Sequence, residues 1–152
     1  TTPILMRFIE DAKKVKGMIL TVQKEVAERL SATAGSKDYG AITAGVNLVG
    51  DAKIIKILGK ELFTPQPNVD SAVIQLEIRE QPKVAVNDES KFFAFIKSCF
   101  AQRRKTLVNT VANTSNYSKE ALKTALTSIG LSETVRAEQL TIEQLAQLSN
   151  ML

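Results

Sequence analysis

The chain has 152 residues, of which 44% are apolar and 24% charged, and it carries a formal net charge of +4. These proportions are ordinary for a globular protein, and no apolar run approaches the ~18 residues needed to span a bilayer, so we expect no membrane segment. With no histidine and a single cysteine, Cys99, the chain lacks the residues for histidine catalysis, a common zinc site or a disulfide framework, and we expect it to act in the cytoplasm without a metal.

The first half of the chain alternates between helical and extended patterns. The pair Thr2-Pro3, a candidate N-cap followed by proline, predicts a helix start. We expect one apolar stripe on this helix: Ile4, Leu5, Phe8 and Ile9. The apolar run 18–22 predicts a strand buried on both faces, as inside a parallel sheet covered by helices. Helices are expected over about 24–34 and 39–49, and a second strand over 52–58.

A proline-rich stretch follows the second strand and reads Phe-Thr-Pro-Gln-Pro-Asn-Val-Asp from Phe63 onward. Pro65 and Pro67 fix their own φ angles and push the residues before them toward extended conformations. Phe63 is therefore expected at the rim of a stiff, non-helical loop, from which a third strand leaves over 69–78. An accessible ring at this place is a plausible stacking platform for a planar ligand. On composition alone a buried, structural Phe63 is the commoner outcome.

The second half of the chain is predicted to be helical. A helix starting near Asp88 or Ser90 carries an aromatic-rich stripe that we interpret as a small core: Phe92, Phe95, Ile96, Cys99 and Phe100. Ser118 is a candidate cap for a later helix that stops at Gly130. Thr141, with Gln144 three residues on, predicts a capping box that opens the last helix.

Between these helices lies a basic tract of three consecutive residues, Arg103, Arg104 and Lys105. We expect the helical pattern to continue over 103–111, with Arg104 sharing a face with the apolar residues and laying its stem along them. Arg103 and Lys105 are then the more exposed pair. By itself the tract is as compatible with a solvated charged face as with a binding surface.

Charge and composition change near residue 82. Residues 1–82 hold 11 basic and 10 acidic residues, whereas residues 83–152 hold 9 and 6. Because the break falls in the segment 81–87, after a strand and before a helix, we expect one domain over 1–82 and a second, helical domain over 83–152. The more basic second part is compatible with a polyanionic partner.

Three segments carry motifs that occur together, in this order, in one enzyme family. They are segment 23–30 (Gln-Lys-Glu-Val-Ala-Glu-Arg-Leu), the F-x-P-x-P-x-V-x-S-x-V motif that begins at Phe63, and segment 100–107 (Phe-Ala-Gln-Arg-Arg-Lys-Thr-Leu). Together they resemble the ribosomal RNA adenine dimethyltransferases, which use S-adenosylmethionine. The resemblance covers most of the chain. It implies an α/β fold: the closing part of a Rossmann-like methyltransferase sheet, with one of its last strands antiparallel, followed by a small all-α C-terminal domain.

The resemblance also implies an activity and roles for particular residues. The family dimethylates two adjacent adenosines in a hairpin of small-subunit ribosomal RNA and thereby takes part in ribosome biogenesis. By position, Phe63 takes the catalytic role of stacking on the target base, with Pro65 and Pro67 shaping the loop against the substrate. Such a stack contributes about 1–3 kcal/mol, and the resemblance favours it over a core role. The tract Arg103 to Lys105 matches a basic segment that faces ribosomal RNA in the assembling subunit.

The chain lacks other parts of the family's pattern. It has no glycine-rich turn, no acidic residue placed to hold the cofactor ribose, and no Asn-Leu-Pro-Tyr motif, which in the family precedes a segment like 1–5. We therefore expect the later portion of a longer enzyme, with the S-adenosylmethionine site mostly in the missing N-terminal part and no cofactor-binding residue in this chain. Alone it should be inactive, and the strand 18–22, lacking its neighbour, should favour self-association through its exposed edge.

Two alternatives stay open. One is an erythromycin-resistance type methyltransferase that acts on large-subunit RNA, and the other is a non-catalytic RNA-binding module in ribosome assembly. The residues 69–72 and the Arg-Arg-Lys tract favour the small-subunit enzyme. Asn47, Ala41 and Val108 stand where the family usually has glutamine, arginine and often a basic residue. These departures leave the detailed RNA contacts open.

Overall fold

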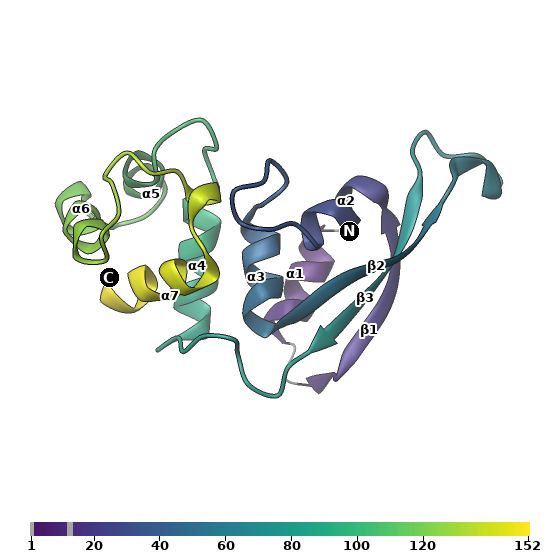
Figure 1. Ribbon diagram of the computed structural model, residues 1–152, viewed down its shortest axis with the longest axis horizontal. Helices are drawn as coiled ribbons and strands as arrows, with labels where there is room; N and C mark the ends of the chain where they lie inside the picture. The colour runs from purple at the N-terminus through teal and green to yellow at the C-terminus, as the bar shows by residue number, and fades with distance from the viewer. Residues whose placement is uncertain (1, 12–13) are drawn as a thin grey trace.

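The computed structural model describes residues 2–11 and 14–152, and its elements alternate between helix and strand before becoming wholly helical (Figure 1). In chain order they are α1 (Thr2–Glu10), β1 (Gly17–Gln23), α2 (Lys24–Leu30), α3 (Ala41–Val49), β2 (Gly50–Leu58), η2 (Lys60–Leu62), β3 (Ser71–Ile78), α4 (Glu89–Cys99), α5 (Leu107–Thr114), α6 (Lys119–Ser128), η3 (Ala137–Gln139) and α7 (Ile142–Met151). The predicted α/β class is confirmed. Among these elements no helix is long and apolar enough to cross a membrane.

The sheet has the order β1-β3-β2, and both pairings are antiparallel. Figure 1 shows α1, α2 and α3 on the same side of it. One face of the sheet is therefore less buried than the other, as in β1, where Val22 is buried and Ile19 is 67% exposed. The prediction that 18–22 lies inside a parallel sheet, buried on both faces, is wrong: within the described residues β1 is an antiparallel edge strand. Its self-association through that edge remains a prediction.

Helix α1 buries a different stripe from the expected one. Leu5, Met6 and Ile9 are buried, whereas Ile4 is 65% and Phe8 51% exposed. The helix packs against α3 rather than being covered all round, so only one side of the apolar pattern is enclosed. It begins at Thr2 itself, which is thus the first helical residue and not the cap.

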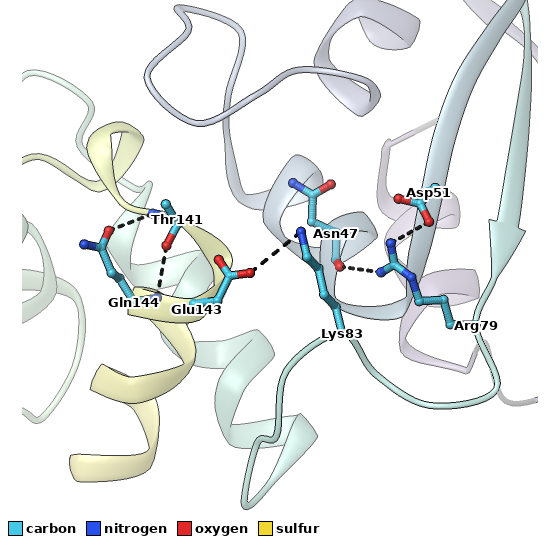
Figure 2. Close-up of polar contacts among 7 residues, drawn as sticks. All are labelled: Asn47, Asp51, Arg79, Lys83, Thr141, Glu143 and Gln144. Carbon is cyan, nitrogen blue, oxygen red and sulfur yellow. Dashed lines mark hydrogen bonds and ion pairs between the residues drawn. The ribbon is translucent and has the colours of Figure 1, made fainter.

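The aromatic stripe of α4 and two of the helix caps are confirmed. Phe92, Phe95, Ile96 and Cys99 are buried, with Phe93 added to them, and Phe100 is partly buried at the helix end. The Ser118 hydroxyl accepts a hydrogen bond from the Ala121 N–H at 3.1 Å at the start of α6. Thr141 and Gln144 bond each other's backbone N–H, as a capping box requires (Figure 2).

The basic tract is not helical, contrary to expectation. Thr106 caps α5, accepting from the Asn109 N–H at 3.4 Å, so the helix begins only at Leu107. The preceding residues form a turn closed by a hydrogen bond from the Lys105 N–H to the Gln102 carbonyl, at 3.0 Å. Arg104 therefore does not share a helix face with the apolar residues of α5, and all three basic residues are exposed.

The two halves of the chain pack directly on each other. Their buried residues form one continuous apolar cluster, and helix α3 lies beside α4 in Figure 1. Gly45 allows this approach, since a Cβ there would lie 3.3 Å from Cε1 of Phe93. The segment that follows β3 is hydrogen-bonded to both halves. The Lys83 N–H donates to the Leu48 carbonyl of α3 at 2.9 Å, and the Asn150 side chain of α7 donates to the Ala85 carbonyl at 3.0 Å. The domain division at 82/83 remains a prediction.

Candidate nucleic-acid interface

The proline-rich loop 59–70 joins β2 to β3 and projects from the end of the sheet (Figure 1). Its base is fixed at two points by one residue. The Asp70 carboxylate accepts from the Lys60 N–H at 3.0 Å, and the Asp70 carbonyl accepts from the Lys24 N–H at 3.0 Å, at the start of α2. The loop is thus attached both to its own first turn and to a neighbouring helix, which limits its motion relative to the sheet.

Phe63 lies in this loop and not in the apolar core. Its side chain is half-buried, and it belongs neither to the buried cluster nor to the partly buried residues packed on that cluster. Its neighbour Leu62 is 67% exposed, Pro65 is exposed and Pro67 half-buried. The Thr64–Pro65 peptide bond is cis. An aromatic ring beside exposed residues on an anchored loop is sterically able to meet a planar group.

A shallow cavity of about 370 Å³ lies at the base of the loop, against α2. Its lining is charged and polar for the most part: Lys24, Glu25, Glu28, Lys60, Asn68, Val69 and Asp70. Phe63 does not line it, so the ring and the cavity are separate features of the same loop.

The three residues of the basic tract have different surroundings. The terminal nitrogen Nη2 of Arg103 donates to the carbonyl oxygens of Lys37, at 2.8 Å, and Tyr39, at 2.7 Å. Arg104 and Lys105 are exposed and form no ion pair within the described part of the chain. Arg103 is exposed, as expected, but it also donates hydrogen bonds to a segment more than sixty residues away.

That segment, the loop 31–40, is held against the helical half by further contacts. The Gly35 N–H donates to the Glu138 carbonyl at 2.7 Å, and the Tyr39 ring packs edge-on against Phe100 with centroids 5.8 Å apart. Tyr39 is 1% exposed, and this burial raises the pKa of Tyr39 to about 12. Asn47 lies near its hydroxyl and opposes the shift, in a geometry too poor for a full hydrogen bond. No local sequence pattern predicts these contacts, because they join distant segments.

An ion pair also bridges the halves, between Lys97 of α4 and Glu10 of α1 at 2.8 Å. Within the second half, Lys83 pairs with Glu143 at 3.7 Å (Figure 2). Glu143 lies in the first turn of α7, where the backbone N–H hydrogen bond lowers the pKa of its carboxyl, assisted by Thr141 and Lys83. Both pairs are substantially exposed, so each contributes little stability, on the order of 0–1 kcal/mol.

Another cavity, of about 780 Å³, lies away from the predicted site residues. It is lined by residues of both charge signs and a few apolar ones: Ile9, Glu10, Lys14, Val15, Lys16, Val49, Ile78, Arg79, Glu80, Gln81, Pro82 and Glu89. Neither cavity contains a glycine-rich turn or another evident cradle for a nucleoside. Across residues 2–11 and 14–152 no three acidic, cysteine or histidine side chains gather to hold a metal ion.

The predicted site residues therefore form two groups that the fold keeps apart. The proline-rich loop and the basic turn occupy opposite halves of the molecule in Figure 1. An extended ligand would be needed to touch both, which suits a polymer better than a small molecule.

Comparison with known proteins gives consistent matches over the whole chain. The family model described as ribosomal RNA adenine dimethylase matches residues 1–152. The ribosomal RNA small subunit methyltransferase A of Geobacillus thermodenitrificans is 43% identical over 155 residues, which are 100% of this chain and 53% of that protein, and the Bacillus cytotoxicus protein of the same name gives the same values. The chain thus spans about half the length of the curated relatives it matches.

Solved structures show the same fold. A dimethyladenosine transferase from Plasmodium falciparum has a TM-score of 0.78 at 23% identity, over 97% of this chain and 61% of that one. The 23S rRNA methyltransferase ErmE has a TM-score of 0.63 at 19% identity, over 99% of this chain and 60% of that one. At these identities the likeness concerns the fold alone.

Proposed function

The chain belongs to the ribosomal RNA adenine dimethylase family, and on that premise we propose that it is part of an S-adenosylmethionine-dependent enzyme that dimethylates N6 of two adjacent adenosines in a small-subunit ribosomal RNA hairpin. The relatives that are 43% identical carry a small-subunit name, which supports this substrate over large-subunit RNA. Such an enzyme would act during ribosome biogenesis in the cytoplasm, with the assembling small subunit as its partner.

The main structural support for this proposal is the position of Phe63. It lies outside the core, on a loop whose base is anchored by Asp70. The exocyclic amine of adenine is a poor nucleophile because its lone pair is delocalised into the ring. A methyltransferase must therefore hold the base flat and in line with the methyl donor. An aromatic face presented by a loop with two prolines meets the first requirement at little entropic cost, because the backbone is already restricted. Phe63 is proposed to stack on the target base.

The residues present do not fit the cofactor. S-adenosylmethionine would supply the methyl group, but the smaller cavity is lined mainly by charged and polar side chains and the other by a mixture of charged and apolar ones. Neither has a glycine-rich turn for the carboxylate or ribose of the cofactor. We assign no cofactor-binding residue to this chain and place that site in the part of the protein outside it. Residues 1–82 are then proposed to contribute the base-binding loop, and residues 83–152 a helical RNA-binding domain.

The experiment uses the complete protein, S-adenosylmethionine with a labelled methyl group, and separate small-subunit and large-subunit RNA substrates. Digestion of the RNA and mass spectrometry should find N6,N6-dimethyladenosine in small-subunit RNA only. Labelling of large-subunit RNA alone would favour the erythromycin-resistance type of enzyme. RNA binding without methyl transfer would favour an assembly module. Residues 1–152 alone should show no specific calorimetric binding of the cofactor.

A further inference from the structure

The segment 79–87 connects β3 to α4, and its first part is hydrogen-bonded to the first half of the chain. The Arg79 N–H donates to the Val49 carbonyl at 2.8 Å, and the Lys83 N–H donates to the Leu48 carbonyl at 2.9 Å. Both carbonyls belong to the last turn of α3. The chain leaving the sheet is thus attached to a helix of the sheet's own half before it reaches the helical half.

The Arg79 side chain reinforces this attachment. Its Nη1 donates to the Asn47 carbonyl at 3.1 Å, and its Nη2 pairs with the Asp51 carboxylate at the start of β2 (Figure 2). The guanidinium is a planar, forked donor, so one side chain bonds the end of α3 and the start of β2 together. Charged donors also form stronger hydrogen bonds than neutral ones.

A single side chain of α7 bonds the other end of the segment. The Asn87 N–H donates to Oδ1 of Asn150 at 2.9 Å, and Nδ2 of Asn150 donates to the Ala85 carbonyl at 3.0 Å. The amide thus uses its acceptor and one donor on two backbone groups two residues apart, as a neighbouring strand would. Val84 and Val86 are partly buried and pack against the apolar core. This end of the segment is therefore attached to the second half.

These contacts make the segment 79–87 a strap, fixed to α3 at one end and to α7 at the other, and not a free linker. The two halves that it joins also share one apolar cluster. Figure 1 shows the loop 59–70 in one half and α7 in the other. The position of the helical half relative to that loop is thus restrained by the strap as well as by the core.

We propose that Asn150 is a positioning residue for methyl transfer: by closing the strap it holds the helical half at a fixed orientation to the loop that carries Phe63. This inference rests on the proposed function and deepens it. An enzyme that dimethylates two adjacent adenosines must bring those bases, and no others, to its base-binding loop. If one half binds the hairpin and the other presents the ring, a fixed connection between them sets which adenosines arrive there in a reactive geometry.

The first experiment tests the strap by amide hydrogen exchange, resolved by NMR, in the complete protein without RNA. Asn150→Ala removes both bonds, so exchange of the Asn87 amide should accelerate. Asn150→Asp keeps an oxygen acceptor for that amide and should leave it protected. Asn116→Ala is the matched control, because the Asn116 side chain is exposed and forms no hydrogen bond within the described residues.

The second experiment measures RNA affinity, methyl transfer at saturating RNA and cofactor, and the sites of methylation, well below the thermal midpoint of each variant. N150A should bind the small-subunit transcript as tightly as the wild type. Its kcat should fall several-fold, because a misplacement of about 1 Å can cost up to ~100-fold in rate. Mass spectrometry of the digested RNA should find N6-methylated adenosines outside the adjacent pair. N116A should match the wild type in all three measurements.

The third experiment releases the opposite end of the strap. Arg79→Met keeps the apolar stem and the backbone bond to Val49 but loses both side-chain contacts. If the strap acts as one element, R79M should lower kcat as N150A does, and N150A should have a smaller effect in the R79M background than in the wild type. Separate structural losses at distant sites would add instead.

Unchanged kcat and unchanged methylation sites in N150A, beside a wild type that methylates the adjacent pair, would overturn the positioning role and leave the proposed function standing. Equal exchange of the Asn87 amide in N150A and the wild type would overturn the strap, and additive effects of N150A and R79M would overturn its action as one element. A wild-type protein that neither methylates nor binds the transcript would contradict the proposed function itself.

Discussion

The carboxylate of Asp70 accepts a hydrogen bond from the backbone N–H of Lys60, at 3.0 Å, and closes the base of the loop that carries Phe63. The same residue accepts a second bond at its carbonyl from Lys24, which opens α2. One residue thus connects the proline-rich loop to its own first turn and to a helix on the sheet. The position of the aromatic ring depends on this connection more than on core packing, because Phe63 lies outside the core.

Replacement of Asp70 with Ala should therefore impair function more than stability. The carboxylate bond is exposed, so its loss should cost only about 0.5–1.5 kcal/mol. Methyl transfer by the complete protein should fall several-fold, and amide exchange over residues 60–69 should accelerate. Asp70→Asn keeps an oxygen acceptor and is the matched control, with activity close to wild type. Equal activity of the Ala and wild-type proteins would contradict the anchoring role.

Gly50 is expected to tolerate no side chain. A Cβ there would overlap the backbone carbonyl oxygen of Glu77 on β3, which cannot move without disturbing the strand pairing. Gly50→Ala should destabilise the protein by at least about 1–3 kcal/mol, a fall in thermal midpoint of roughly 2–4 °C per kcal/mol. At Gly40 nothing lies within 4 Å of an added Cβ and the backbone is extended. Gly40→Ala should therefore lower the midpoint much less than Gly50→Ala, by no more than the cost of placing Ala at the N-cap of α3. A midpoint for G50A equal to that of G40A would contradict the close approach of β2 and β3.

Because the Tyr39 hydroxyl is buried, we expect the free energy of unfolding to fall at alkaline pH. Burial raises its pKa from 10.0 to about 12, so above pH 10 the unfolded chain ionises while the folded protein stays neutral. The stabilisation is complete below pH 10 and is lost as the pH rises toward 12, by an amount on the order of 2 kcal/mol. Tyr39→Phe has no such group. The free energy of unfolding should be measured in urea for the wild type and Y39F at pH 8 and pH 11. From pH 8 to pH 11 the wild type should lose more stability than Y39F. An equal loss in the two proteins would contradict the burial of this hydroxyl.

Local signals in the sequence predicted local structure well. The caps at Ser118 and Thr141 were predicted because the residue that caps and the amide that donates are three positions apart. Thr106 caps α5 in the same way, but this cap was not predicted from the sequence. Arg104 has helical spacing to Leu107, Val108 and Val111, so the pattern predicts one helix that begins before Thr106. Periodicity alone does not mark a turn that interrupts it.

Contacts between distant segments could not be predicted in this way. The apolar run of β1 predicts a strand. It does not indicate that the strand pairs with β3 or that Ile19 is exposed. Arg103 reads as one of three equivalent basic residues, and only the fold shows that its donors meet carbonyls in the loop 31–40. The role of Phe63 was predicted from the resemblance of its motif, since the residues alone leave stacking and packing both open.

The measurement that tests the central claim most directly pairs methyl transfer with thermal midpoint for three substitutions of Phe63 in the complete protein. If the ring stacks on the target base, Phe63→Ala should cut methyl transfer at least ~10-fold, given about 1–3 kcal/mol for a lost stack. Phe63→Leu should also be poorly active, whereas Phe63→Tyr should keep much of the activity, and all three should melt close to wild type. An active Leu variant together with a destabilised Ala variant would contradict stacking. That pattern is expected of a Phe63 packed in the core, because loss of a buried Phe costs about 3–5 kcal/mol of stability.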